Sequence, residues 1–286
     1  MKKGIKIESI IDLYNKGLTP VQISEELGCT IANITRRLKK ENIKVVPNYS
    51  KSRRTRKGYY SLNEDYFYFI DDETSAYLLG LMYADGSVVS NGCYLKMKEE
   101  ESLIKLRDAI QGNMPIKKYT RIYKNKEFSC YIISIYSIKI KSNLIKWGCH
   151  PNKTFDIRLP NINPVLLPHF IRGFFDGDGC ISIGKTISKL HFNITSAALD
   201  FLNDIRPILS NIATKNGSIY KEKNTNTYHL RYTGKAALNI LNWLYKDSTI
   251  YLNRKYIKYK IVSRIKIGRI AGKSKLDNQQ PSLGSA

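Results

Sequence analysis

An internal repeat governs how this sequence is interpreted. Residues 78–86 read LLGLMYADG and residues 171–179 read IRGFFDGDG. Each copy is an apolar stretch with glycine in its third position and Asp-Gly at its end, and the two aspartates, Asp85 and Asp178, lie 93 residues apart. The chain is therefore expected to contain two similar halves.

The spacing of later residues agrees with a duplication. Tyr131 precedes Trp147 by 16 residues, and Tyr228 precedes Trp243 by 15 residues. Apolar periodicity predicts two short strands, a helix, two strands and another helix after each Asp-Gly. The predicted strands cover residues 87–90, 93–98, 116–124 and 128–137 and then 180–185, 190–195, 217–223 and 227–233, and the predicted helices cover 100–111, 138–147, 196–212, 235–246 and 252–266.

The charge of the chain indicates a polyanionic partner. The sequence has 47 Lys and Arg against 24 Asp and Glu, a formal net charge of +23 and a pI near 9.7. Lysines and arginines that neutralise phosphates release counterions, so nucleic acid is the favoured partner. An anionic membrane would require a basic amphipathic helix, whereas the basic runs here lie in loop-like or strand-like contexts.

Composition excludes several other classes of protein. A hydrophobic content of 42% is enough to bury a core. No apolar run approaches a membrane span or a signal peptide, which predicts a soluble protein in the cytoplasm or nucleoid and not a secreted one. The five cysteines form no CxxC pair and the four histidines are scattered, so neither a disulfide framework nor a zinc site is indicated.

Residues 1–45 resemble a helix-turn-helix domain. Apolar residues at helical spacing predict a first helix, Pro20 opens a second, and a turn at Gly28 leads into a third. A short Gly-containing turn before a basic helix is typical of motifs whose last helix enters the major groove of DNA. The alternative is a helical bundle with a solvated charged face. The candidate DNA-binding residues are Thr30, Asn33, Arg36, Arg37 and Lys39.

Residues 46–61 are predicted to be a basic linker, and residues 268–286 a polar, disordered tail. Five basic residues in seven follow residue 50, including Arg53, Arg54 and Arg56. Such a run is either solvated and flexible or follows phosphates and enters a minor groove, and the sequence leaves both open.

The glycines of the repeat predict how the two aspartates meet. Glycine inside a helix costs about 1 kcal/mol relative to alanine, so Gly80 and Gly173 require a reason, which close packing of the two helices supplies. Packed in this way, the helices bring Asp85 and Asp178 together at their ends. Paired carboxylates repel unless a divalent cation neutralises them, and oxygen ligands suit Mg²⁺. The alternative is that each Asp-Gly only ends a helix.

On these motifs the chain resembles the single-chain, two-repeat LAGLIDADG homing endonucleases, over residues 62–160 and 161–267. The resemblance implies an α+β fold, a saddle of two αββαββα units with two antiparallel sheets, beside the small all-α N-terminal domain. It also implies a monomer that makes Mg²⁺-dependent double-strand breaks with 3′ overhangs in a long asymmetric DNA target. Mn²⁺ is expected to substitute for Mg²⁺.

The resemblance also carries roles to particular residues. It implies metal binding by Asp85 and Asp178, with the carbonyls of Ala84 and Gly177 as further ligands. The catalytic lysines of the family correspond to Lys153 and Lys255, although either lysine could instead contact phosphate. Tyr83 departs from the family pattern, which often has an aspartate there, as Asp176 does in the second copy.

Strand alternation offers candidate DNA-facing residues. If Ile116 and Ile122 face the core, the residues between them face away; if Tyr228 and Leu230 face inward, their neighbours face outward. The candidates are Lys117, Tyr119, Arg121 and Tyr123 in the first copy and Lys221, Lys223, His229 and Arg231 in the second.

Two other functions remain open. Some transcription regulators combine a LAGLIDADG-like domain with a helix-turn-helix and bind DNA without cutting it. An intron maturase would use the same fold on RNA. Both aspartates and both lysines are present here, which favours the endonuclease.

Overall fold

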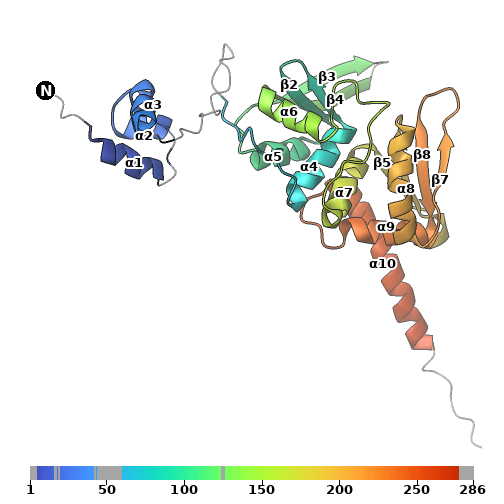
Figure 1. Cartoon of the computed structure of the whole chain (residues 1–286). Helices are drawn as coiled ribbons and strands as arrows, with labels where there is room; N and C mark the ends of the chain where they lie inside the picture. Colours follow the sequence, from blue (N-terminus) through green and yellow to red (C-terminus); the bar gives the residue numbers. More distant parts are fainter. Residues whose placement is uncertain are drawn as a thin grey trace, which may run out of the picture. The chain divides into compact units, whose positions relative to one another are not determined.

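The computed structural model describes residues 5–15, 18, 20–41, 43, 60–123 and 126–276. The chain forms two compact units, residues 1–59 and residues 60–286 (Figure 1). Each unit has its own apolar core. Among the described residues, no helix combines the length and the apolar character needed to cross a membrane.

The described part of the N-terminal unit contains three helices, α1 (Ile7–Asn15), α2 (Pro20–Glu26) and α3 (Ile31–Lys40). Its core consists of Ile10, Ile23, Ile34 and Leu38. Gly28, with φ +61°, lies in the turn between α2 and α3, where a left-handed backbone favours glycine. Thr30 then caps α3, since its hydroxyl accepts a hydrogen bond from the Asn33 amide at 3.3 Å.

The larger unit repeats one order of elements. Its first half contains α4 (Glu73–Ala84), β1 (Gly86–Val89), β2 (Gly92–Met97), α5 (Glu100–Ala109), β3 (Ile116–Tyr123), β4 (Lys126–Ile135) and α6 (Ile138–Lys146). Its second half contains η1 (Pro164–Leu166), α7 (Leu167–Asp178), β5 (Gly179–Ser182), η2 (Ile187–Lys189), β6 (His191–Ser196), α8 (Leu199–Ala213), β7 (Ser218–Lys221), β8 (Tyr228–Thr233), α9 (Gly234–Tyr245) and α10 (Asn253–Leu276).

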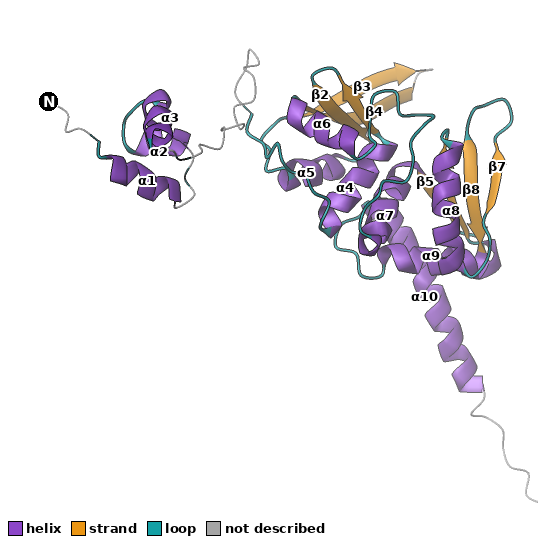
Figure 2. Ribbon diagram, in the orientation of Figure 1, coloured by secondary structure: helices purple, strands orange, loops and turns teal. Residues whose placement is uncertain are grey.

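The two halves form antiparallel sheets with the same strand order, β1-β2-β4-β3 (sheet 1) and β5-β6-β8-β7 (sheet 2). Helices α5 and α6 pack on one face of sheet 1, and α8 and α9 pack on one face of sheet 2 (Figure 2). Buried strand residues alternate with exposed ones, so each sheet has a core face and an outward face. The predicted α+β class with two antiparallel sheets is confirmed.

Helices α4 and α7 lie in contact at the centre of this unit. Helix α4 begins at a capping box between Asp72 and Ser75, and every residue from Ser75 to Tyr83 is buried, as expected for a helix enclosed on all sides. A Cβ at Gly80 would lie 2.0 Å from the Phe170 carbonyl oxygen, and one at Gly173 would lie 1.9 Å from that of Tyr77. Only glycine therefore permits this approach from either side.

Some boundaries differ from those expected. Helix α10 continues to Leu276 instead of ending near residue 266, because Gly268 and Gly272 weaken a helix without ending it and no proline occurs before Pro281. Helix α8 begins at Leu199 because Ser196 pairs with Tyr228 as the last residue of β6. Residues 44–59, which include most of the expected linker, and residues 277–286 lie outside the described residues.

Candidate functional site

The ends of α4 and α7 bring two carboxylates together. Asp85 is the C-cap residue of α4, and Asp178 is the last residue of α7. Between them lies Gly177: a Cβ there would come within 2.4 Å of the Ala84 Cβ and 2.7 Å of the Asp85 Oδ2. The absence of a side chain at residue 177 therefore leaves the space that the Asp85 carboxylate uses.

Both carboxyl groups hold their protons more tightly than usual. Removal from water raises the pKa of Asp85, although the ammonium groups of Lys255 and Lys153 oppose this shift. Asp178 is exposed on one side. Partial removal of its carboxyl group from water, and then repulsion from the Asp85 carboxylate, still raise its pKa to about 6. Carboxylates that disfavour their own ionisation form a site that a positive charge would stabilise.

A lysine lies beneath each helix end. Lys153 donates to the carbonyl oxygen of Tyr83 at 2.6 Å, and Lys255 donates to the carbonyl of Phe175 and, at 2.8 Å, to that of Asp176. Both lysines are buried, and both donate hydrogen bonds to carbonyl oxygens at a helix C-terminus. Burial lowers the pKa of Lys255 to about 8, while the nearby Asp176 carboxylate opposes the shift.

Tyr83 and Asp176, two residues before the paired aspartates, both point into the protein. The Tyr83 hydroxyl donates to the Trp147 carbonyl. Asp176 is 0% exposed and accepts from Tyr245 Oη at 2.5 Å, Leu252 N at 2.7 Å and Tyr77 Oη at 2.9 Å. Tyr83, by donating, thus ties the end of α4 to the segment that precedes Lys153. Asp176, by accepting, ties the end of α7 to the segment that precedes Lys255.

A second buried network was missed by the sequence analysis. Arg172 is 1% exposed, pairs with Glu73 at 2.6 Å and donates to the carbonyls of Ile250 and Leu244 at 2.9 and 2.8 Å. Glu73 also accepts from the backbone and hydroxyl of Thr249. An arginine inside an apolar helix was the only signal for this network in the sequence. Its effect is to fasten the start of α4 to the loop before α10.

The donor set fits a hard divalent cation. Asp85 and Asp178 supply carboxylate oxygens beside the space that the missing side chain of Gly177 leaves open. The raised pKa values of these two carboxyl groups favour their neutralisation by a cation. Within the described ranges no cluster of three or more His, Cys, Asp or Glu side chains could hold a metal. Carbonyls, water and substrate phosphate would therefore complete the shell, as Mg²⁺ commonly requires.

The candidate residues of the N-terminal unit lie mostly on one side of α3. Asn33, Arg36 and Arg37 line a surface hollow together with Ile5 and Lys40. Arg37 also donates to the Ile5 carbonyl at 2.6 Å, so it helps hold the start of the unit. Two further candidates, Thr30 and Lys39, lie at the cap of α3 and on its exposed surface, and three more, Arg53, Arg54 and Arg56, lie outside the described residues.

On sheet 1 one assumption behind the DNA-facing residues was wrong. Ile122 does not face the core but is 75% exposed, because β2 pairs with β4 only as far as Tyr131, whereas Ile122 pairs with Glu127 beyond the end of that pairing. Lys117, Tyr119 and Arg121 are exposed, and Lys96 Nζ lies 5.3 Å from the centre of the Tyr119 ring. The backbone of β3 ends at a further candidate, Tyr123, whose side chain is not described.

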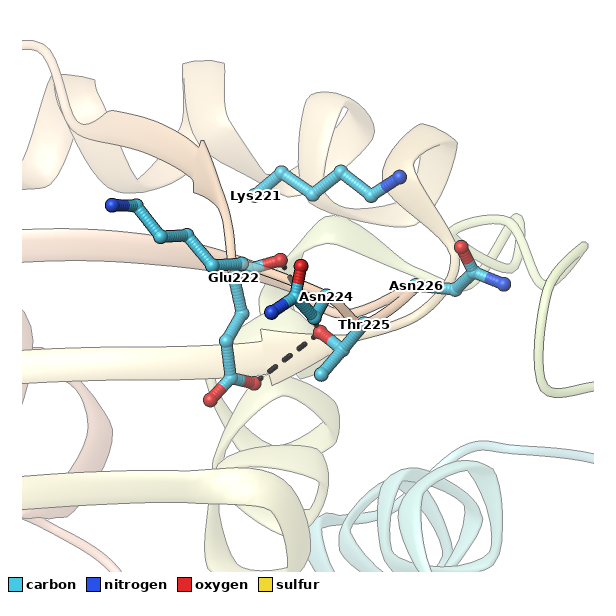
Figure 3. A pocket seen from close by; sticks show the side chains of 6 residues that line it. Lys221, Glu222, Asn224, Thr225 and Asn226 are labelled. Carbon is cyan, nitrogen blue, oxygen red and sulfur yellow. Dashed lines mark hydrogen bonds between the residues drawn. The ribbon is translucent and has the colours of Figure 1, made fainter.

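On sheet 2 the candidates separate into two groups. His229 and Arg231 alternate with the buried Leu230 and Tyr232 and lie on the outward face. Lys221 lies on the opposite face of the sheet. It pairs with Tyr228, the neighbour of His229 along β8, and successive strand residues point to opposite faces. Lys223 follows the end of β7 in an exposed turn, where Thr225 Oγ1 donates to the carbonyl and to the carboxylate of Glu222 at 3.4 and 3.5 Å (Figure 3).

The second half of the larger unit matches a known protein family. Residues 167–242 match the LAGLIDADG-like domain. The LAGLIDADG-like segment spans α7 to most of α9, and it includes Gly173, Gly177 and Asp178. No curated protein sequence matches the chain.

Solved structures with a similar arrangement share little sequence with the chain. Full-length WhiA from Thermatoga maritima is 17% identical, with 75% of this chain and 70% of that chain covered and a TM-score of 0.45. The meganuclease I-SmaMI bound to uncleavable DNA is 16% identical over 68% and 91% of the two chains, with a TM-score of 0.45. I-DmoI in complex with DNA and Mn is 17% identical over 62% and 98%, with a TM-score of 0.41.

The raised pKa of Asp178 gives a prediction about stability. Without divalent metal, the free energy of unfolding should fall as pH rises from about 4 to about 6, because the folded carboxyl (pKa about 6) keeps a proton that the unfolded one (about 4) has lost. Asp178→Asn should weaken this pH dependence, to which Asp85 also contributes, and raise the free energy of unfolding at pH 7 by about 1 kcal/mol, a value reduced for solvent screening of the exposed carboxylate. Urea unfolding in EDTA at pH 4, 5, 6 and 7 measures both effects. An unchanged pH dependence in the variant would show that Asp178 is not the titrating group.

Proposed function

We propose that the chain is a site-specific DNA endonuclease of the single-chain, two-repeat LAGLIDADG type, with an N-terminal helix-turn-helix that adds DNA contacts. The observation that carries the proposal is the pair Asp85 and Asp178, which meet at the ends of two glycine-packed helices with a buried lysine beneath each. The match of residues 167–242 to a LAGLIDADG-like domain supports the same assignment. Mg²⁺-dependent breaks with 3′ overhangs are the expected outcome.

In this mechanism the chain supplies position and charge. A divalent cation, if bound to the carboxylates, would supply positive charge for phosphodiester hydrolysis. Asp85 and Asp178 would hold that cation in their ionised forms, so protonation of Asp178 would oppose binding. Lys153 and Lys255 fix the carbonyls at the two helix ends and add positive charge beside the scissile phosphates.

The outward faces of the two sheets are proposed as the DNA-binding surface. Their exposed basic and aromatic residues include Lys117, Tyr119 and Arg121 on sheet 1 and Arg231 on sheet 2. The formal charge of +23 favours a phosphate backbone as partner. Because one chain contributes both carboxylates, a monomer acting on an asymmetric site is expected.

A DNA-binding regulator without catalysis is the second candidate. One observation favours it: both buried lysines already bond helix-end carbonyls, which is a structural role that a non-catalytic protein would also keep. Selection from a randomised duplex pool in EDTA, followed by addition of Mg²⁺ to the bound fraction, separates the two functions. An endonuclease would cut the selected duplexes on both strands, whereas a regulator would retain them intact. Selective retention of RNA instead would point to a maturase.

Replacing the lysines separates capping from catalysis. If Lys153 and Lys255 act on the scissile phosphates, Lys153→Met and Lys255→Met should each slow cleavage by about a hundredfold or more while the melting temperature changes by only a few degrees. If the lysines only cap α4 and α7, the melting temperature should fall substantially in each variant. The fraction of protein that remains folded should then cleave DNA at the normal rate. Cleavage and thermal unfolding of both variants measure the two effects together, with Lys215→Met as control, because Lys215 is exposed after the end of α8 and lies outside the proposed DNA-binding surface.

A further inference from the structure

A group of four side chains on the outward face of sheet 2 forms a preorganised surface. It consists of Asn193 on β6, Tyr220 on β7, and His229 and Arg231 on β8, and we call it the β8 cluster. Asn193 pairs with Arg231, and Tyr220 pairs with His229, across neighbouring strands. Directly paired residues share a face of the sheet, so all four side chains lie opposite the buried core.

The contacts within the β8 cluster hold the Arg231 guanidinium in place. Its Cζ lies 5.0 Å from the centre of the Tyr220 ring, within the range of a cation–π contact. The Tyr220 ring stacks on His229 with centres 5.0 Å apart and planes at 20°. His229 is held in turn, because Asn193 Nδ2 donates to its Nδ1 at 3.0 Å. Arg231 itself remains exposed, so its N–H donors are available to a ligand above the sheet.

Sheet 1 has a serine, not an arginine, at the position that corresponds to Arg231. The shared register makes Gly86 equivalent to Gly179, since these residues pair with Leu95 and Ile194 in the two sheets. Leu95 pairs with Ile133 as Ile194 pairs with Leu230, so Ser134 of sheet 1 corresponds to Arg231. By the same register Ile132 corresponds to His229. The two sheets therefore present different chemistry at the same position: a planar cation on sheet 2, and a hydroxyl beside an isoleucine on sheet 1.

An oriented, exposed guanidinium is the side chain that matches guanine in the major groove. Guanine presents two acceptors there, O6 and N7, and arginine meets both at once with a pair of parallel N–H donors. A phosphate contact would need no such orientation, because any flexible Lys or Arg can supply it. The stacking of Arg231 on Tyr220 restricts the guanidinium before DNA arrives, which favours a directional contact over a diffuse one.

We propose that Arg231 reads a guanine in the half of the DNA target that lies against sheet 2, and that the corresponding position of sheet 1, occupied by Ser134, makes no matching contact. This inference rests on the proposed function and specifies its substrate: a duplex whose two half-sites differ, with one obligatory G·C pair in the half-site that lies against sheet 2.

The test is selection of duplexes from a randomised pool in EDTA, where DNA is bound but not cut. The full chain is compared with Arg231→Ala, Arg231→Lys and, as control on sheet 1, Lys117→Ala. The unaltered chain should select a guanine in one half-site. Arg231→Ala should lower discrimination at that base pair by about tenfold to a hundredfold and leave the other positions unchanged, and Arg231→Lys should restore it only in part. Lys117→Ala should leave that guanine preference intact.

Two further variants test the role of the stacking. Tyr220→Phe keeps the ring beneath Arg231 and should keep the guanine preference, whereas Tyr220→Ala should weaken it. Equal loss of affinity for all sequences in Arg231→Ala would make Arg231 a phosphate contact and overturn the inference. A preference that changes in both half-sites would overturn it as well. If the unaltered chain selects no sequence, the proposed function itself fails and the inference falls with it.

Discussion

Replacing either Asp85 or Asp178 by Asn is expected to slow DNA cleavage by about a thousandfold or more. Asparagine keeps the shape and hydrogen-bonding capacity of the side chain but removes the charge that holds a divalent cation, and a cation in such a site contributes several kcal/mol to the transition state. DNA binding in EDTA should remain within a few-fold of the unaltered protein, because the cation is not needed for contacts made by the sheets. Cleavage rates in Mg²⁺ and binding constants in EDTA measure the two effects separately.

The matched control for these variants is Asp108→Asn. Asp108 is an exposed carboxylate on α5 whose ion pair is with its neighbour Arg107. Its loss removes the same charge from the protein without touching the helix ends, so cleavage should stay unchanged. Normal cleavage by Asp85→Asn or Asp178→Asn would remove these residues from the metal site.

The second large effect concerns Gly173, where α7 meets α4. A Cβ at this position would lie 1.9 Å from the Tyr77 carbonyl oxygen and 3.0 Å from the Leu81 amide nitrogen. These are backbone atoms of a buried helix, so the two helices must separate to admit a methyl group. Gly173→Ala is therefore expected to reduce the free energy of unfolding by about 3 kcal/mol or more, the upper part of the range for overpacked cores.

The comparison for this variant is Gly112→Ala. Here a Cβ would approach the Met114 Sδ at 2.5 Å, which is the far end of a flexible side chain that can move aside. Its cost should stay below about 1 kcal/mol. Urea unfolding of the two variants measures the difference. A tolerated Gly173→Ala would mean that the helices do not approach as closely as the account requires.

Much of this architecture could be predicted because short-range patterns determine it. Strand alternation placed His229 and Arg231 on one face of sheet 2 and Leu230 on the other. The repeated glycines predicted the α4–α7 contact from the cost of glycine within a helix. These inferences depend on residues a few positions apart, where backbone geometry leaves few choices.

What could not be predicted depends on long-range placement. The exposure of Ile122 follows from where β2 ends, and that is a property of the sheet rather than of β3. The different uses of Tyr83 and Asp176 follow from partners 64 and 76 residues away, Trp147 and Leu252. The buried pair of Arg172 and Glu73 joins residues 99 positions apart. No local pattern in a single sequence identifies such partners.

The proposed function depends above all on joint binding of a divalent cation by Asp85 and Asp178. The most direct measurement is calorimetric titration of the metal-free protein with Mn²⁺ at pH 7.5, for the unaltered chain and for Asp85→Asn, Asp178→Asn and Asp108→Asn. We expect Mn²⁺ to bind the unaltered chain and Asp108→Asn, with at least about a tenfold loss of affinity in each of the other two variants. Equal Mn²⁺ binding by all four proteins, or none by the unaltered chain, would contradict it.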